Sequence, residues 1–166
     1  MNAAAFFPDR AALQRVVAGL AALLNAIVFA AILRRAASGQ PFMPTGYNAI
    51  VMLHVVTVTP ALPLGAWLFS TTKGDALHRL LGRVWALLIL VTAVTSFGIH
   101  QLTGHLSVIH ILSVITIVSV VRGVLAARKG RIVEHRSHMI GAFTGITLAG
   151  VFTFLPGRLL AQWLFG

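Results

Sequence analysis

The segment LHVVTVTPALPLGAWLFSTTKGDALHRLLGR, residues 53–83, is repeated in outline later in the chain. The second copy is IHILSVITIVSVVRGVLAARKGRIVEHR, residues 109–136. In each copy a histidine (His54 or His110) is followed three positions later by a hydroxyl residue and nineteen positions later by Lys-Gly, and a His-Arg pair ends the copy. A match at fixed offsets inside otherwise apolar sequence predicts an internal duplication of a helix–basic turn–helix unit.

The composition is that of an integral membrane protein. The 166 residues are 58% hydrophobic and only 10% charged, whereas a soluble domain carries about 25% charged residues. Three carboxylates (Asp9, Asp75 and Glu134) leave little for acid–base pairs or a calcium cage. The absence of cysteine excludes disulfides, zinc–thiolate sites, iron–sulfur clusters and thiol nucleophiles. Histidine, with seven copies, is the remaining metal ligand or proton carrier.

The formal charge of +10 comes from basic residues that flank apolar spans. Basic residues in such positions set the orientation of transmembrane helices and contact anionic lipid headgroups. Membrane lipids are therefore expected partners, and nucleic acid is not.

Five apolar spans are long enough, or nearly so, to cross a bilayer, which takes about 20 helical residues. They cover residues 16–33, 48–70, 84–101, 106–127 and 139–165. A basic start before an apolar run also occurs in signal peptides, but two arginines after the first span favour a retained helix.

The predicted fold is therefore all-α, with five transmembrane helices, the last four of which form a duplicated bundle. Residues 1–47 would hold the first helix and an outer loop. The bundle would cover residues 48–166 and consist of repeats 48–102 and 103–166.

Basic residues in the connections predict the orientation. One side would hold nine of them and the other side three, which places the amino terminus in the cytoplasm. Trp67, Trp85 and Trp163 lie near span ends, where interfacial aromatic residues are common.

In this topology the repeated histidines form two pairs. Helices two and four are parallel and carry His54 and His110 at matched depth near the outer face. His78 and His135 precede helices three and five near the cytoplasmic face. Two histidines at one height on separate helices are what a haem b iron needs as axial ligands, so the pairs predict one or two haems.

Arginines near both faces could receive the haem propionates, namely Arg79, Arg136 and Arg158. Thr57 and Ser113, three residues after their histidines, could bond to helix carbonyls or orient an imidazole.

Other interpretations of the histidines stay open. Histidine at a membrane boundary is tolerated without a ligand, and His-Arg beside lysine also suits anionic headgroups. His100 and His105 could join His54 and His110 in a copper or zinc site. His138 is an alternative ligand to His135 on the same helical face.

Four motifs resemble those of a family of predicted bacterial membrane proteins, domain of unknown function 2306. They are HRLLGRVW (78–85), IHILS (109–113), EHRSHM (134–139) and AGVFTFLPGR (149–158). The resemblance covers roughly residues 48–160; it implies a small inner-membrane protein and brings no activity. In architecture, two histidine pairs on helices two/four and three/five are similar to the dihaem transmembrane cytochromes of the b561 type, without that family's sequence motifs.

The leading hypothesis is a b-type haem protein for transmembrane electron transfer, an oxidoreductase component of quinol- or ferric-reductase type. Its partners would be quinone or a respiratory protein, and a homo-oligomer is compatible with the sequence. The alternative is a non-redox accessory or lipid-binding subunit without a cofactor. A proton or metal transporter is disfavoured because carboxylates are so few.

Overall fold

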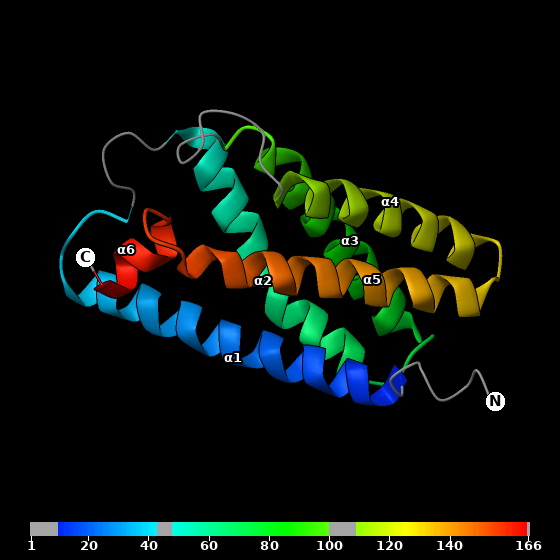
Figure 1. Ribbon diagram of the computed structural model, residues 1–166. Coiled ribbons are helices and arrows are strands. Elements are labelled where there is room, and N and C mark those ends of the chain that lie inside the picture. Colours follow the sequence, from blue (N-terminus) through cyan, green and yellow to red (C-terminus); the bar gives the residue numbers. More distant parts are fainter. Residues whose placement is uncertain (1–9, 43–47, 100–108, 166) are drawn as a thin grey trace, which may run out of the picture.

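Five helices that are long and apolar enough to cross a membrane run through the computed structural model, which describes residues 10–42, 48–99 and 109–165 (Figure 1). All regular structure in the described residues is helical, as the sequence predicts. The helices are α1 (Arg10–Ala37), α2 (Ala49–Ser70), α3 (Ala76–Ser96), α4 (Ile109–Arg128), α5 (Ile132–Val151) and α6 (Leu159–Phe165), with a 3-10 turn, η2 (Phe152–Phe154).

Both Lys-Gly pairs form the turn of a helical hairpin, α2 with α3 and α4 with α5. Gly74 and Gly130 take the left-handed conformation, with φ of 93° and 71°, which an L side chain adopts only with strain. After α4 the amide of Arg131 donates to the carbonyl of Ala126, a standard helix-ending pattern. Asp75 then caps α3 by accepting from the amide of His78 at 2.7 Å. Both turns therefore contain a glycine in the left-handed conformation, but they differ in length: residues 71–75 join α2 to α3, and residues 129–131 join α4 to α5.

Helix α3 lies between its hairpin partner α2 and the first helix of the second hairpin, α4. The backbones of α2 and α5 approach closely at few points, where large side chains such as Phe69 and Phe143 lie between them. Helix α1 packs against both, with α6 beside it. The side of the bundle between α2 and α5 is thus covered by α1. Both hairpin turns lie at the end of the molecule where α1 begins (Figure 1).

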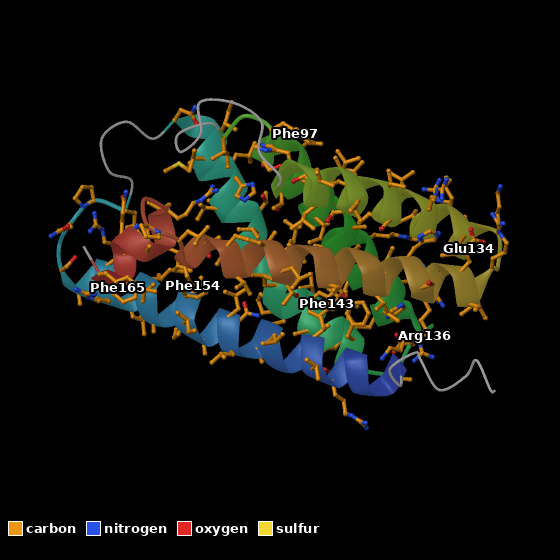
Figure 2. The ribbon with its side chains drawn as sticks, viewed as in Figure 1. Phe97, Glu134, Arg136, Phe143, Phe154 and Phe165 are labelled. Atoms are coloured by element: carbon orange, nitrogen blue, oxygen red, sulfur yellow. The ribbon has the colours of Figure 1, made fainter. Side chains whose placement is uncertain are left out.

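An aromatic cluster fills the core between the two hairpins. Trp85 is 2% exposed and donates from Nε1 to the carbonyl of Ala61 at 3.0 Å. Phe143, which points inward from α5 (Figure 2), stacks on Phe69 with 4.7 Å between ring centroids. Gly65 lies against this cluster, because a Cβ there would come within 2.7 Å of atoms of both Phe143 and Trp85.

The expected interfacial role is wrong for two of the three tryptophans. Trp85 belongs to the core, and Trp163 is 6% exposed and donates to the carbonyl of Phe42 at 2.9 Å. Only Trp67, 40% exposed, is placed as predicted. A tryptophan near a span end can face protein as well as headgroups, and its hydropathy is the same in both cases.

The predicted fifth span, residues 139–165, is wrong in its bounds. The helix begins at Ile132, inside the basic segment, and the apolar span ends at Phe154. Leu155 is extended, as residues before proline tend to be, and Gly157 has a φ of 82°. Pro156-Gly157 therefore ends the helix, and α6 is a separate short helix. The third helix, Ala76–Ser96, extends back through the HRLLGR segment, which the sequence also allows, and it ends before the predicted residue 101.

We expect Gly65→Ala to lower the free energy of unfolding by about 1–3 kcal/mol, since the new methyl group must displace packed rings. The matched control is Gly82→Ala in α3, where a Cβ meets nothing within 4 Å. Denaturation by SDS in mixed micelles measures both. Equal stability of the two variants would contradict this account of the core.

Candidate functional site

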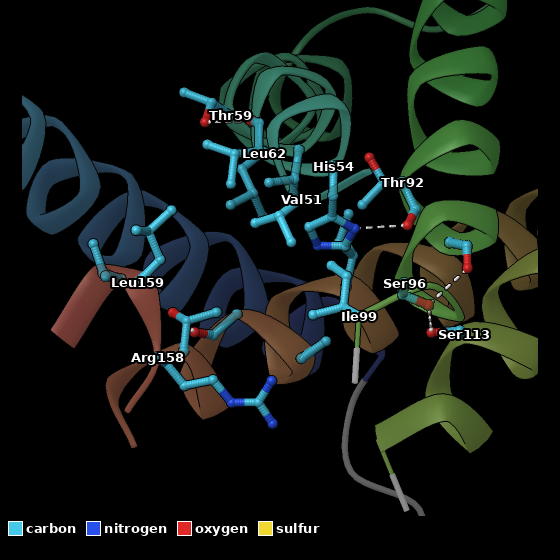
Figure 3. Close-up of a pocket in the computed structure, with 18 of the residues that line it drawn as sticks. Val51, His54, Thr59, Leu62, Thr92, Ser96, Ile99, Ser113, Arg158 and Leu159 are labelled. Carbon is cyan, nitrogen blue, oxygen red and sulfur yellow. Dashed lines mark hydrogen bonds between the residues drawn. The ribbon is translucent and has the colours of Figure 1, made fainter. Parts of the chain in front are cut away.

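A cavity of about 220 Å³ lies among all six α-helices at the end of the bundle where α3 finishes. Its walls are mainly apolar, and the repeated histidines His54 and His110 both line it, together with Arg158 (Figure 3). Both histidines, predicted to form a pair, therefore line one cavity from separate hairpins. Their role as ligands stays a prediction.

On α2, His54 and Thr57 both contact Thr92 of α3, an arrangement we call the α2 clamp. Nδ1 of His54 lies 2.9 Å from the carbonyl oxygen of Thr92 (Figure 3). The hydroxyl of Thr92 donates to that of Thr57 at 2.9 Å. One residue of α3 therefore binds both repeated polar residues of α2, through its main chain and its side chain.

On α4, His110 and Ser113 contact Ser96 in the same way, which we call the α4 clamp. Nε2 of His110 lies 3.2 Å from the carbonyl oxygen of Ser96. The hydroxyls of Ser96 and Ser113 are 2.7 Å apart. The ring of His110 also packs against Phe97, with centroids 5.6 Å apart.

The two clamps explain why a histidine is repeated with a hydroxyl three residues later. Residues three apart lie on one face of a helix, so each pair can contact a single residue of α3. Thr92 and Ser96 are one helical turn apart on α3, which ends at Ser96. The signal available in the sequence was the hydroxyl-rich end of the third span, which lies outside the repeated motif.

The α2 clamp also determines which nitrogen of His54 faces the cavity. With Nδ1 turned to Thr92, the other ring nitrogen, Nε2, points away from α3 toward the space that Arg158 also borders (Figure 3). This is the orientation of a histidine held by a main-chain carbonyl and presenting Nε2 to a ligand.

Arg158 reaches the cavity because Pro156-Gly157 ends the α5 span just before it. Had the helix continued, this residue would have lain on the long fifth span predicted from the sequence. Instead the segment between η2 and α6 brings its guanidinium to the cavity wall (Figure 3). A permanent cation and an imidazole thus border the same apolar space.

A haem b ligated by both His54 and His110 does not fit this arrangement. Nε2 of His110 is directed at the Ser96 carbonyl, and the two rings meet α3 one turn apart. The cavity, at about 220 Å³, is similar in size to an apolar cavity of about 150 Å³ that binds one benzene. Haem content itself is untested and stays a prediction.

His78 and His135 lie at the opposite end of the bundle and do not line this cavity. His78 is within electrostatic range of His135, and Nδ1 of His135 lies 2.9 Å from the carbonyl of Gly123. Nδ1 of His78 is buried and has no hydrogen-bond partner in the described part of the chain. His138 approaches Glu134 at 3.9 Å. His78 and His135 are therefore close enough to interact electrostatically, and their role as ligands stays a prediction.

The remaining predicted site residues are distributed as follows. Arg79 bonds to the carbonyl of Gly74 in its own turn, and Arg136 is exposed near the end where α3 begins (Figure 2). His100 and His105 lie outside the described residues. Among residues 10–42, 48–99 and 109–165, no group of three or more histidines and carboxylates is placed to hold a metal ion.

The comparisons with known proteins give one result. The family described as "Predicted membrane protein (DUF2306)" matches residues 51–164. No curated protein and no solved structure matches the chain.

We expect Thr57→Val and Thr92→Val to be coupled in stability, by about 0.6 kcal/mol, the average for interhelical hydrogen bonds in a membrane protein. SDS denaturation of the two single variants and the double variant gives the coupling energy. The control cycle pairs Thr57→Val with Ser113→Ala, whose hydroxyls contact different residues of α3. A coupling as large in the control cycle as in the first would rule out a specific α2 clamp.

Proposed function

The chain belongs to the DUF2306 family of predicted membrane proteins, and on that premise we propose that it is a binding protein for a small amphiphile dissolved in the bilayer. The amphiphile's headgroup would occupy the cavity. The observation that carries this proposal is the pairing of His54 and Arg158 on the wall of one apolar space inside the bundle.

The size of the cavity favours a headgroup of one ring or similar bulk. Pockets for drug-sized molecules have volumes of roughly 300–1,000 Å³, and this one is smaller, at about 220 Å³. A single substituted ring therefore fits, whereas a phospholipid headgroup with its glycerol does not.

The distribution of polarity favours an amphiphile over a polar solute. Ionisable groups inside a membrane protein are costly and generally functional, and three of them (His54, His110 and Arg158) border this space. The rest of the wall is largely aliphatic, including Leu24 and Val28 of α1. Because α1 packs against both α2 and α5 and also lines the cavity, an apolar tail would leave the cavity past α1 toward lipid.

Electron transfer through haem is the second candidate, favoured by the meeting of His54 and His110 at one cavity. The volume of that cavity weighs against it. We expect the purified protein, expressed with ample haem, to show no α band in a dithionite-reduced minus oxidised spectrum. An α band lost in His54→Ala and His110→Ala, but retained in the exposed-site control Arg122→Gln, would establish the haem protein instead.

We expect an amphiphile to co-purify with the protein at about one per chain and to be lost when the cavity is filled. Ala149, which lines the cavity, is a suitable position, and Ala149→Leu adds bulk without adding a polar group. Native mass spectrometry after gentle detergent release compares this variant with wild type.

The control for that measurement is Ala127→Leu, an exposed position in α4 outside the cavity lining. It should retain the bound species at the wild-type level. An identical set of bound molecules in wild type, Ala149→Leu and Ala127→Leu would exclude the cavity as the binding site.

A further inference from the structure

We propose that the occupant of the cavity is a quinol, a ring with two opposed hydroxyl groups, and that the site prefers it to the corresponding quinone. This inference rests on the proposed function, because it names the chemical class of the amphiphile. It follows from which atoms at the cavity wall can donate a hydrogen bond and which can only accept one.

The hydrogen on His54 is assigned by its neighbours. The carbonyl of Thr92 can only accept, so Nδ1 must be the donor in the 2.9 Å contact. The hydroxyl of Thr95 lies 3.2 Å from the same nitrogen, and its only hydrogen is directed at the carbonyls of Val91 (2.8 Å) and Thr92 (3.0 Å). Thr95 therefore also accepts from Nδ1. In the neutral imidazole this leaves Nε2 as a hydrogen-bond acceptor facing the cavity.

Arg158 has the opposite character, because a guanidinium has five donors and no acceptor. The two groups come from different parts of the chain, α2 and the segment before α6, and both line the cavity. A ligand that matches both groups therefore has one hydroxyl that donates to Nε2 of His54 and one oxygen that accepts from Arg158.

A quinol satisfies both requirements, since one hydroxyl donates to Nε2 and the other oxygen accepts from the guanidinium. A quinone has only carbonyl oxygens, so its lone pairs would face the lone pair of Nε2. A fatty-acid carboxylate would bind Arg158 well but has no hydrogen for His54. A phenol with one hydroxyl can donate to Nε2 but has no second oxygen to accept from Arg158. The apolar walls suit the ring and its alkyl substituents, and about 220 Å³ suits a single ring.

The test uses the purified full-length protein in detergent, under anaerobic conditions, with four probes: duroquinol, duroquinone, the single-hydroxyl analogue 2,3,5,6-tetramethylphenol, and laurate. Trp163 lines the cavity, so quenching of tryptophan fluorescence reports binding. Trp163→Phe supplies the background from Trp67 and Trp85. We expect duroquinol to bind roughly 3- to 10-fold more tightly than duroquinone or the phenol, the worth of one net hydrogen bond.

Two variants separate the role of Nε2 from that of the α2 clamp. In His54→Asn the amide nitrogen takes the place of Nδ1 and keeps the bond to Thr92, while the acceptor at Nε2 is removed. We expect this variant to fold and to bind duroquinol and duroquinone with equal affinity. Arg158→Gln should weaken both ring probes together, and Arg122→Gln should change neither.

The outcomes distinguish this inference from the function on which it rests. Equal or tighter binding of duroquinone, the phenol or laurate in wild type would overturn the quinol assignment, and so would a preference that survives in His54→Asn. Either result leaves the amphiphile-binding proposal standing if Ala149→Leu still releases a co-purified molecule. Failure of every probe, together with no effect of Ala149→Leu, would remove both.

Discussion

Inside a bilayer a polar side chain finds no water, so its hydrogen bonds must come from the protein itself, and in this fold α3 supplies them. Its last turns offer main-chain oxygens and hydroxyls at Thr92 and Ser96, and each is taken by one repeat. The two hairpins are thereby fixed to one helix through matched polar contacts. The cavity lies beside these contacts, with His54 and His110 on its wall, and its chemistry follows from them.

Much of the fold could be predicted from the sequence because membrane helices are read from hydropathy and turns from glycine and charge. The repeated Lys-Gly pairs predicted two hairpins, and both glycines have positive φ in the structure. What could not be predicted depended on long-range packing. The hydropathy of residues 139–165 does not reveal that Pro156-Gly157 ends the span, although the dipeptide itself was a visible signal. Nor does hydropathy distinguish a buried Trp85 from an interfacial one.

In the candidate site, too, local sequence patterns were predictive and the tertiary contacts were not. Repetition predicted that His54 and His110 would act together, and both line the cavity. It could not identify their partners, because Thr92 and Ser96 lie outside the repeated motif and are brought to it by tertiary packing. The haem hypothesis assumed that paired histidines are level and free to ligate. In the structure the two histidines contact α3 one turn apart, His54 in the α2 clamp and His110 in the α4 clamp. The α2 clamp leaves Nε2 of His54 as an acceptor that faces the cavity.

The central claim is that α3 holds His54 with Nδ1 donating and Nε2 open to the cavity. Solid-state NMR of the protein labelled with ¹⁵N-histidine in lipid bilayers, with His54→Asn to assign the signal, measures this tautomer directly. The account predicts a protonated Nδ1 and an unprotonated Nε2 for His54 at neutral pH. A hydrogen on Nε2, in either the other neutral tautomer or the imidazolium, would contradict it.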